Sequence, residues 1–293
     1  MKKEIPKIQF NQGNSLDIEV MSIAQLFDKI NLAKNHNPYT VHRIQFFLIL
    51  VVTENSYSHF VDFKSYELSE GSALFIAKNQ VHHFTEALQK VKGYCIIFNS
   101  SFMEKYYYLS DNLKLNRLFN YHIETPVIHQ SEMGKDHLMG IAHQLYKEYN
   151  LPDKFAKSEI LRTLLHLLLL KAERAKSVQS SIGRIKPYWL EIFNNFENML
   201  EKDYVNTRSS RIYASNLFVS YKFLNDVVKQ LSGKTVKTFI DDFVTIEIKR
   251  YLVSTTLSIK EISFETGFEE PANMVKFFKK KTKTTPLKFR QQQ

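Results

Sequence analysis

The sequence predicts an α+β protein in which a barrel or sandwich of short antiparallel strands precedes an all-helical part. Between about Thr40 and Asn99, apolar and polar residues alternate and turn residues separate the segments, which is typical of antiparallel strands. From about Ser131 onward, apolar residues instead recur every three or four positions, as in helices. A polar segment with Gly183 and Pro187 divides the helical part in two.

The strand pattern is carried by five segments: IQFFLILVV, SHFVDF, ALFIA, HHFTEA and KGYCIIF. Cys95 lies in the last of them among apolar neighbours, so we expect a buried strand residue rather than a nucleophile. It is the single cysteine of the chain, which rules out an internal disulfide framework and fits a reducing cytoplasm.

Two helices are predicted after the strands. The first runs through Met133, His137, Ile141 and Leu145 and ends near Tyr149. The second follows Pro152 and continues to about Ala175; its apolar residues are Phe155, Ile160, Leu164, Leu165, Leu168 and Leu169. These residues cover much of the helix circumference, which predicts packing on two sides, one against the strands and one against a partner subunit. A homodimer is therefore expected.

The clearest linker is AKSVQSSIGRIKP, from Ala175 to Pro187, which is small, polar and closed by glycine and proline. The predicted domains are residues 1–176, with the strands and the dimerisation helices, and the helical residues 188–293, joined by a linker at 177–187.

Charge points to a polyanionic partner. The 293 residues have a formal net charge of +10, and residues 276–290 contain seven basic residues and no acidic one. A solvated helix face would explain such a run, but we interpret it as a surface for a polyanion, with nucleic acid the leading candidate. A further alternative to duplex DNA is a protein that binds RNA or a membrane surface through this basic tail. The start, MKKEIPKIQF, has no apolar core of a signal peptide, and the longest apolar runs are too short to span a bilayer, so we expect a cytoplasmic protein.

Residues 258–281 predict two helices joined by a tight turn. Ser258 and Glu261 form a capping box, and Gly267 suits the left-handed residue that ends the first helix. Pro271 begins the second helix after Glu270. Its buried face holds Met274, Phe277 and Phe278, and its opposite face holds Ala272, Asn273, Lys276 and Lys279. Such a pair can place its second helix in a major groove.

Residues 209–231 predict a second unit of this kind. Ile212, Tyr213 and Leu217 mark its first helix, Phe218 and Val219 its turn, and Ser220 the start of its second helix. Buried positions there are Leu224, Val227, Val228 and Leu231, exposed ones are Lys222, Asn225, Asp226 and Lys229, and Gly233 ends the helix. A long helix from Val236 to beyond Leu252 connects the two units.

The block from about Tyr188 to Arg290 resembles the DNA-binding domain of AraC-type (arabinose-regulator-like) transcription factors. The resemblance rests on GF-x-x-P-x-x-x-x-x-FFKK at 267–280, on TPLKFR, and on YASNLFVSYKFLNDVVKQLSGKT. The first turn lacks the family's glycine, Asp226 brings an acid to a DNA-facing position, and Ser263 stands where alanine is usual.

The resemblance implies two recognition helices in successive major grooves of double-stranded DNA, and RNA polymerase as a partner. Base-facing candidates are Lys222, Asn225, Asp226, Pro271, Ala272, Asn273 and Lys276. Phosphate-contact candidates are Lys229, Lys279 and Lys280. For each, the alternative is an idle surface residue. Asp226 could accept a hydrogen bond from a cytosine amino group.

The stretch from His42 to Phe84 resembles the cupin-like antiparallel β-barrel that precedes such domains. Gly71 and His82 echo the second cupin motif, but the metal-binding His-x-His pair is missing, because Ile44 follows His42 by two residues. We therefore expect no metal, no cofactor and no catalytic residue, and treat His42, His59 and His82 as candidates for binding a small-molecule effector. The barrel could also serve as a dimerisation scaffold alone. The competing function is a metal-dependent cupin enzyme fused to a DNA-binding module.

Overall fold

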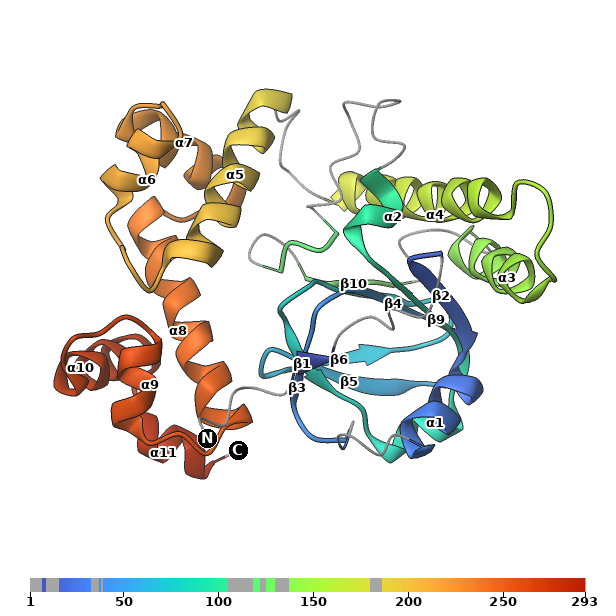
Figure 1. Cartoon of the computed structure of the whole chain (residues 1–293), viewed down its shortest axis with the longest axis horizontal. Coiled ribbons are helices and arrows are strands. Elements are labelled where there is room, and N and C mark those ends of the chain that lie inside the picture. The colour runs from blue at the N-terminus through green and yellow to red at the C-terminus, as the bar shows by residue number, and fades with distance from the viewer. Residues whose placement is uncertain are drawn as a thin grey trace. The chain divides into compact units, whose positions relative to one another are not determined.

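A computed structural model describes residues 7–8, 16–32, 37, 39–104, 118–121, 125–129, 137–179 and 186–292. The chain divides between Ser181 and Ile182 into two compact units, drawn in Figure 1. In the described part of the chain, no helix combines the length and the apolarity needed to cross a membrane.

The N-terminal unit contains two five-stranded sheets, so the predicted α+β class with antiparallel strands first is confirmed. One sheet has the order β1-β3-β8-β5-β6 and the other β10-β7-β4-β9-β2. Among the described residues, the strand pairs are antiparallel except β1 with β3. The strands are β1 Lys7–Ile8, β2 Ile18–Ser22, β3 His42–Ile44, β4 Phe47–Glu54, β5 Tyr57–Val61, β6 Lys64–Leu68, β7 Ala73–Ile76, β8 Val81–His83, β9 Lys92–Phe98 and β10 Val127–Ile128.

The helices of this unit are α1 Ile23–Leu32, the 3-10 helix η1 Glu86–Lys90, α2 Ser100–Glu104, α3 His137–Asn150 and α4 Lys157–Gln179. The predicted helix ending near Tyr149 is α3; the part of that prediction at Met133 lies outside the described residues. The next helix begins at Lys157 rather than around Phe155, whose side chain is 98% exposed before α4 starts. α4 also continues three residues into the predicted linker.

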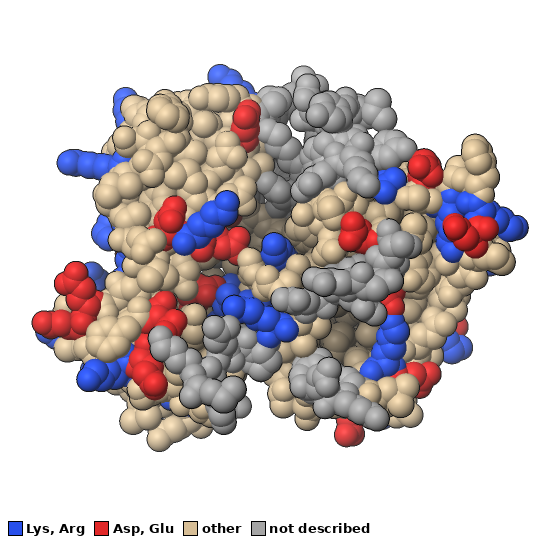
Figure 2. Space-filling model, in the orientation of Figure 1, with Lys and Arg blue, Asp and Glu red and all other residues tan. Residues whose placement is uncertain are grey.

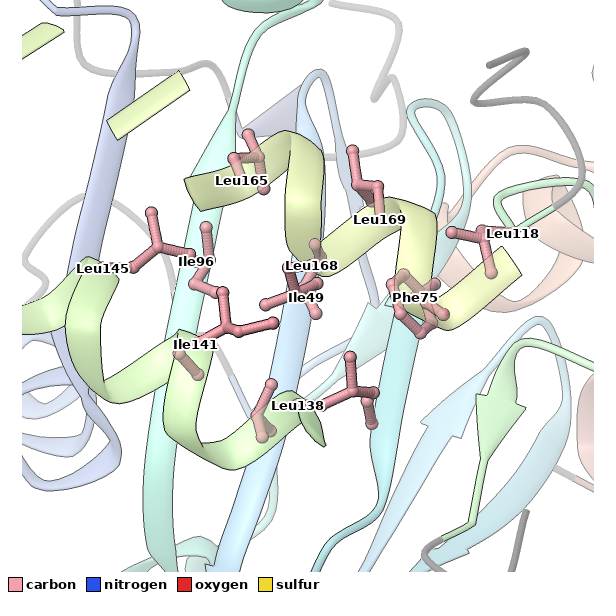
Figure 3. Close-up of a cluster of buried hydrophobic side chains, with 14 of the residues drawn as sticks. Ile49, Phe75, Ile96, Leu118, Leu138, Ile141, Leu145, Leu165, Leu168 and Leu169 are labelled. Carbon is pink, nitrogen blue, oxygen red and sulfur yellow. The ribbon is translucent and has the colours of Figure 1, made fainter. Parts of the chain in front are cut away.

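Central strand β4 is buried on both faces, which explains its unbroken apolar run. Leu48 and Leu50 face the core between the two sheets. Ile49 and Val51 face the opposite way, toward a second core that α3 and α4 cover (Figure 3). Cys95 on β9 is fully buried in the first core, as predicted, and burial raises the pKa of its thiol to about 12.

The leucines of α4 belong to this second core. Leu165, Leu168 and Leu169 are buried against the sheet and α3 (Figure 3). Leu164 is half-buried and packs against the same cluster. Three of these leucines are therefore buried in the chain's own core and Leu164 is half-buried beside it, so they do not form the second apolar face expected to meet a partner subunit. A different set of α4 side chains is partly exposed, at about 40% each: Ile160, Leu167 and Leu170.

The C-terminal unit is all helical. Its helices are α5 Pro187–Asp203, α6 Ser210–Asn216, α7 Tyr221–Ser232, α8 Val236–Ser254, α9 Ile259–Glu265, α10 Pro271–Thr282 and α11 Pro286–Gln291. The long helix α8 runs between a group formed by α6 and α7 and a group formed by α9, α10 and α11 (Figure 1). Its core is rich in aromatic rings, with Phe193, Phe196 and Phe239 in mutual contact.

Candidate nucleic-acid interface

The first helix pair, α6 and α7, begins and ends as its sequence predicts. The Ser220 hydroxyl accepts a hydrogen bond from the backbone N–H of Phe223, 3.1 Å away, and so caps α7. Gly233 ends α7 with a left-handed φ of 70°. The predicted apolar stripe, which begins at Leu224, is buried, so the opposite face of α7 is left at the surface.

The second pair, α9 and α10, has the predicted capping box. The Ser258 hydroxyl accepts from the Glu261 N–H, and the Glu261 carboxylate accepts from the Ser258 N–H. Pro271 opens α10, where Met274 and Phe278 are buried. Ser263 is fully buried, and its hydroxyl donates to the carbonyl of Lys260 at 2.8 Å, so serine fits this contact without an unpaired group.

The two turns share one backbone hydrogen-bond pattern. In the first, the N–H groups of Phe218 and Val219 bond the carbonyls of Ser215 and Ala214. In the second, those of Gly267 and Phe268 bond Phe264 and Ser263 in the same way. Phe218 therefore takes the glycine position of its turn and has a φ of +56°, with a side chain that is 96% exposed.

Most predicted contact residues lie at the surface of α7 and α10. Those exposed are Lys222, Asp226, Lys229, Ala272, Asn273, Lys276, Lys279 and Lys280, and Pro271 is half-buried. Asn225 is different: it is half-buried, and its Oδ1 accepts a hydrogen bond from the Val236 N–H at 3.2 Å. This amide therefore connects α7 to the start of α8.

Positive charge is uneven over this unit. In Figure 2, Lys and Arg project at the left edge over α6 and α7, whereas both signs occur lower down, toward α10. Lys281, part of the basic run, bonds Asp242 of α8 at 3.1 Å, and Lys234 bonds the same carboxylate at 2.7 Å. Burial alone would raise the pKa of Asp242, but the hydrogen bonds from these two lysines hold it below its usual value.

Sequence reasoning missed Arg208. It lies between α5 and α6, where nothing in the pattern marks it, yet its guanidinium reaches the turn between α9 and α10. Burial lowers its pKa. An arginine 58 residues away in sequence can be matched to this turn only once the chain is folded.

In the N-terminal unit, the three predicted histidines form one buried cluster. His59 Nε2 lies 3.1 Å from His82 Nδ1, and its Nδ1 lies 3.0 Å from the Tyr57 hydroxyl. The His42 and His82 rings are 4.5 Å apart. Burial, then the neighbouring His83 and His42, lower the pKa of His59 to about 3, so its ring is neutral.

A pocket of about 160 Å³ borders the cluster. His42 and His82 line it, with apolar residues of β3, β4 and α1 and with Lys29, whereas His59 contacts His82 and is not part of the lining. Among the described residues, no group of three or more His, Cys, Asp or Glu side chains is arranged to hold a metal ion.

Residues 213–292 match a protein family described as a helix-turn-helix domain. A transcriptional regulator of the AraC-type DNA-binding domain-containing proteins from Chromobacterium violaceum is 19% identical, over 36% of this chain and 96% of that chain, with a TM-score of 0.33. The C-terminal domain of the two-component response regulator yesN from Fusobacterium nucleatum is 24% identical, over 32% and 93%, with a TM-score of 0.31. ToxT from Vibrio cholerae is 12% identical, over 93% and 97%, with a TM-score of 0.46. No curated protein matches the chain.

Proposed function

We propose that this chain is a DNA-binding transcription regulator of the AraC type, and that it reads duplex DNA through α7 and α10 of the helix-turn-helix domain matched at residues 213–292. The observation that carries the proposal is the pair of capped helices in one compact unit, each with an exposed polar face. A major groove about 12 Å wide admits one such helix.

Roles follow from chemistry and position. Asn273 can bind an adenine edge and Lys276 or Lys222 a guanine edge, since these are the donors and acceptors that those bases match. Pro271 and Ala272 offer apolar contact near the start of α10, and Asp226 an acceptor on α7. Lys229, Lys279 and Lys280 contact phosphates, which position the protein without specifying sequence. Asn225 connects α7 to α8 through its hydrogen bond with Val236. It contributes to DNA recognition only by positioning α7.

The test begins with selection of binding sites from random duplexes. On the selected site, Asn273→Ala should relax preference at one base position, at a cost of about 1–3 kcal/mol. Lys279→Ala and Lys280→Ala should weaken selected and random duplexes alike, and each should reduce the slope of log K against log salt by about 1. If all three variants act equally on selected and random DNA, the assigned recognition face is wrong.

The regulator responds to a small molecule bound in the N-terminal pocket. A lining that is apolar except for two imidazoles and Lys29 suits a small, mostly apolar ligand with one polar group. A ligand that copurifies with the chain should dissociate on denaturation and be identified by mass spectrometry. His82→Ala should weaken it by removing a polar partner, and Ile97→Trp should exclude it by filling the pocket. Retention at full occupancy in Ile97→Trp would place the ligand elsewhere.

The chain acts as a homodimer in the cytoplasm. Its partners are double-stranded DNA and RNA polymerase. Dimerisation is supported by the partly exposed apolar side chains of α4, which are Ile160, Leu167 and Leu170. A dimer would place two DNA-binding domains on one operator, so the selected sites should contain repeated halves.

A further inference from the structure

Arg208 connects the two helix-turn-helix units directly. It lies just before α6, and its Nη2 donates a hydrogen bond to the carbonyl oxygen of Thr266, in the turn before α10. Its guanidinium carbon lies 3.7 Å from the ring centre of Phe268 and 5.8 Å from that of Phe277 on α10. A planar, permanently charged group on an aromatic face makes both contacts at once, which lysine cannot reproduce.

The backbone beside Arg208 is also in contact with this turn. Gly267 has a φ of +77°, and a Cβ atom there would lie 2.2 Å from the carbonyl oxygen of Val205. The segment between α5 and α6 therefore meets the turn without any space for a side chain. Arg208 lies three residues along this contact, where its side chain covers Phe268.

The other end of α10 is held as well. Lys281 bonds Asp242 of α8 at 3.1 Å, and Lys234, just after α7, bonds the same carboxylate. Helix α10 is thus held by Arg208 through the preceding turn and Phe277, and near its end by Asp242. Both connections lead to the elements that surround α7.

We propose that Arg208 is a positioning residue that fixes the separation of α7 and α10, and so the spacing of the two DNA segments that they read. This inference rests on the proposed function. One helical turn of DNA is about 34–36 Å for 10–10.5 base pairs, so a shift of one base pair moves and rotates a segment relative to its helix. If the connection between α7 and α10 is rigid, the two helices bind both DNA segments only at one spacing. If the connection is loose, they also bind segments at neighbouring spacings.

The test uses the full chain and the selected duplex, together with duplexes in which the two read segments are one base pair closer or farther apart. The wild type should prefer the selected spacing by about tenfold or more, as for a mismatched base pair. Arg208→Met keeps an unbranched chain over Phe268 but loses the hydrogen bond and the charge. It should reduce this preference to about twofold or threefold, while base preferences within each segment and the salt slope stay as in the wild type.

Arg211→Met is the matched control, because Arg211 is an exposed arginine on α6 and its replacement removes the same charge. It should keep the spacing preference. Arg208→Ala should reduce the spacing preference further. If the Arg208→Ala protein does not fold, the Arg208→Met result alone tests the inference. An Arg208→Met protein that keeps the tenfold preference, or that loses affinity equally at every spacing, overturns the inference. Absence of any sequence-selective binding by the wild type would instead contradict the proposed function.

Discussion

At the scale of single residues, Phe218 has a left-handed backbone conformation that a residue with a side chain disfavours. The turn at Phe218 has the same backbone hydrogen bonds as the turn at Gly267. These hydrogen bonds, and not an intrinsic preference of phenylalanine, therefore account for the left-handed conformation. A residue with a Cβ is strained there, and the ring offers nothing in return because it is almost fully exposed. Phenylalanine at this position therefore carries a cost in stability.

Phe218→Gly should stabilise the folded chain by about 1 kcal/mol, since relief of the strain outweighs the added freedom of the unfolded chain. Urea unfolding of the C-terminal unit measures it. Phe218→Ala is the control, because it removes the ring and keeps the strain, and it should change stability little. Equal stabilisation by both variants would mean that the exposed ring, not the backbone, is responsible.

His59 makes the stability of the N-terminal unit depend on pH. The pKa of His59 is about 3 in the folded chain, lowered by burial and by His83 and His42, against about 6.5 when unfolded. Protons therefore bind the unfolded state preferentially between these values, so stability should fall as pH decreases from about 6.5 toward 3.

The pH effect is measured as the urea midpoint of the N-terminal unit at pH 7 and pH 5. The midpoint should fall at pH 5, and His59→Leu should reduce the fall even if it lowers stability at both pH values. His143→Gln, at an exposed histidine on α3, is the control, and its urea midpoint should fall at pH 5 as much as that of the wild type. A fall that is the same in His59→Leu and in the wild type would assign the effect to other groups.

At the scale of elements, α4 has two apolar faces with different roles. Leu165 and Leu168 complete the core on the sheet, while Leu167 and Leu170 are about 40% exposed on the other side. A charge on the first face must be buried without a partner, whereas a charge on the second remains in water.

Leu165→Glu should therefore destabilise the N-terminal unit by more than about 3 kcal/mol, a size typical of an unpaired buried charge. Leu167→Glu should leave the monomer folded, because the new charge remains in water, and should convert the proposed dimer to monomer. Sedimentation equilibrium of the full chain measures the mass, with circular dichroism as the check on folding. A folded Leu167→Glu protein that is still dimeric would exclude this face of α4 from the interface.

At the scale of the whole molecule, a β unit with a buried histidine cluster is joined to a DNA-binding unit in one chain. Two imidazoles of this cluster share a hydrogen bond, and His59 bonds Tyr57 through its other nitrogen. Both ring nitrogens of His59 are therefore engaged with other side chains of the protein.

Elemental analysis of the chain, purified without an affinity tag, should accordingly find no stoichiometric iron, manganese or zinc. Addition of these metals should not raise the thermal midpoint of the N-terminal unit, because a folded protein with no site gains nothing from mass action. One equivalent of metal in the wild type that is lost in His82→Ala would instead support the alternative function, a metal-dependent enzyme fused to a DNA-binding module.

The sequence by itself determined the class of fold and both helix pairs of the helix-turn-helix domain. These depend on local signals: alternation in strands, the capping box at Ser258, the glycine ends at Gly233 and Gly267, and Pro271 at the start of α10. Each acts within a few residues of the chain, so its pattern is visible without the fold.

Only the tertiary structure decided which apolar face of α4 is covered, what Asn225 bonds, and how the two helix pairs are joined. The periodicity of α4 shows an excess of leucine, but whether the sheet or another subunit covers Leu165 depends on where the strands lie. Arg208 and Thr266 are 58 residues apart, and no local rule couples them. Contacts between distant segments form only when the whole chain packs, because packing alone brings those surfaces together.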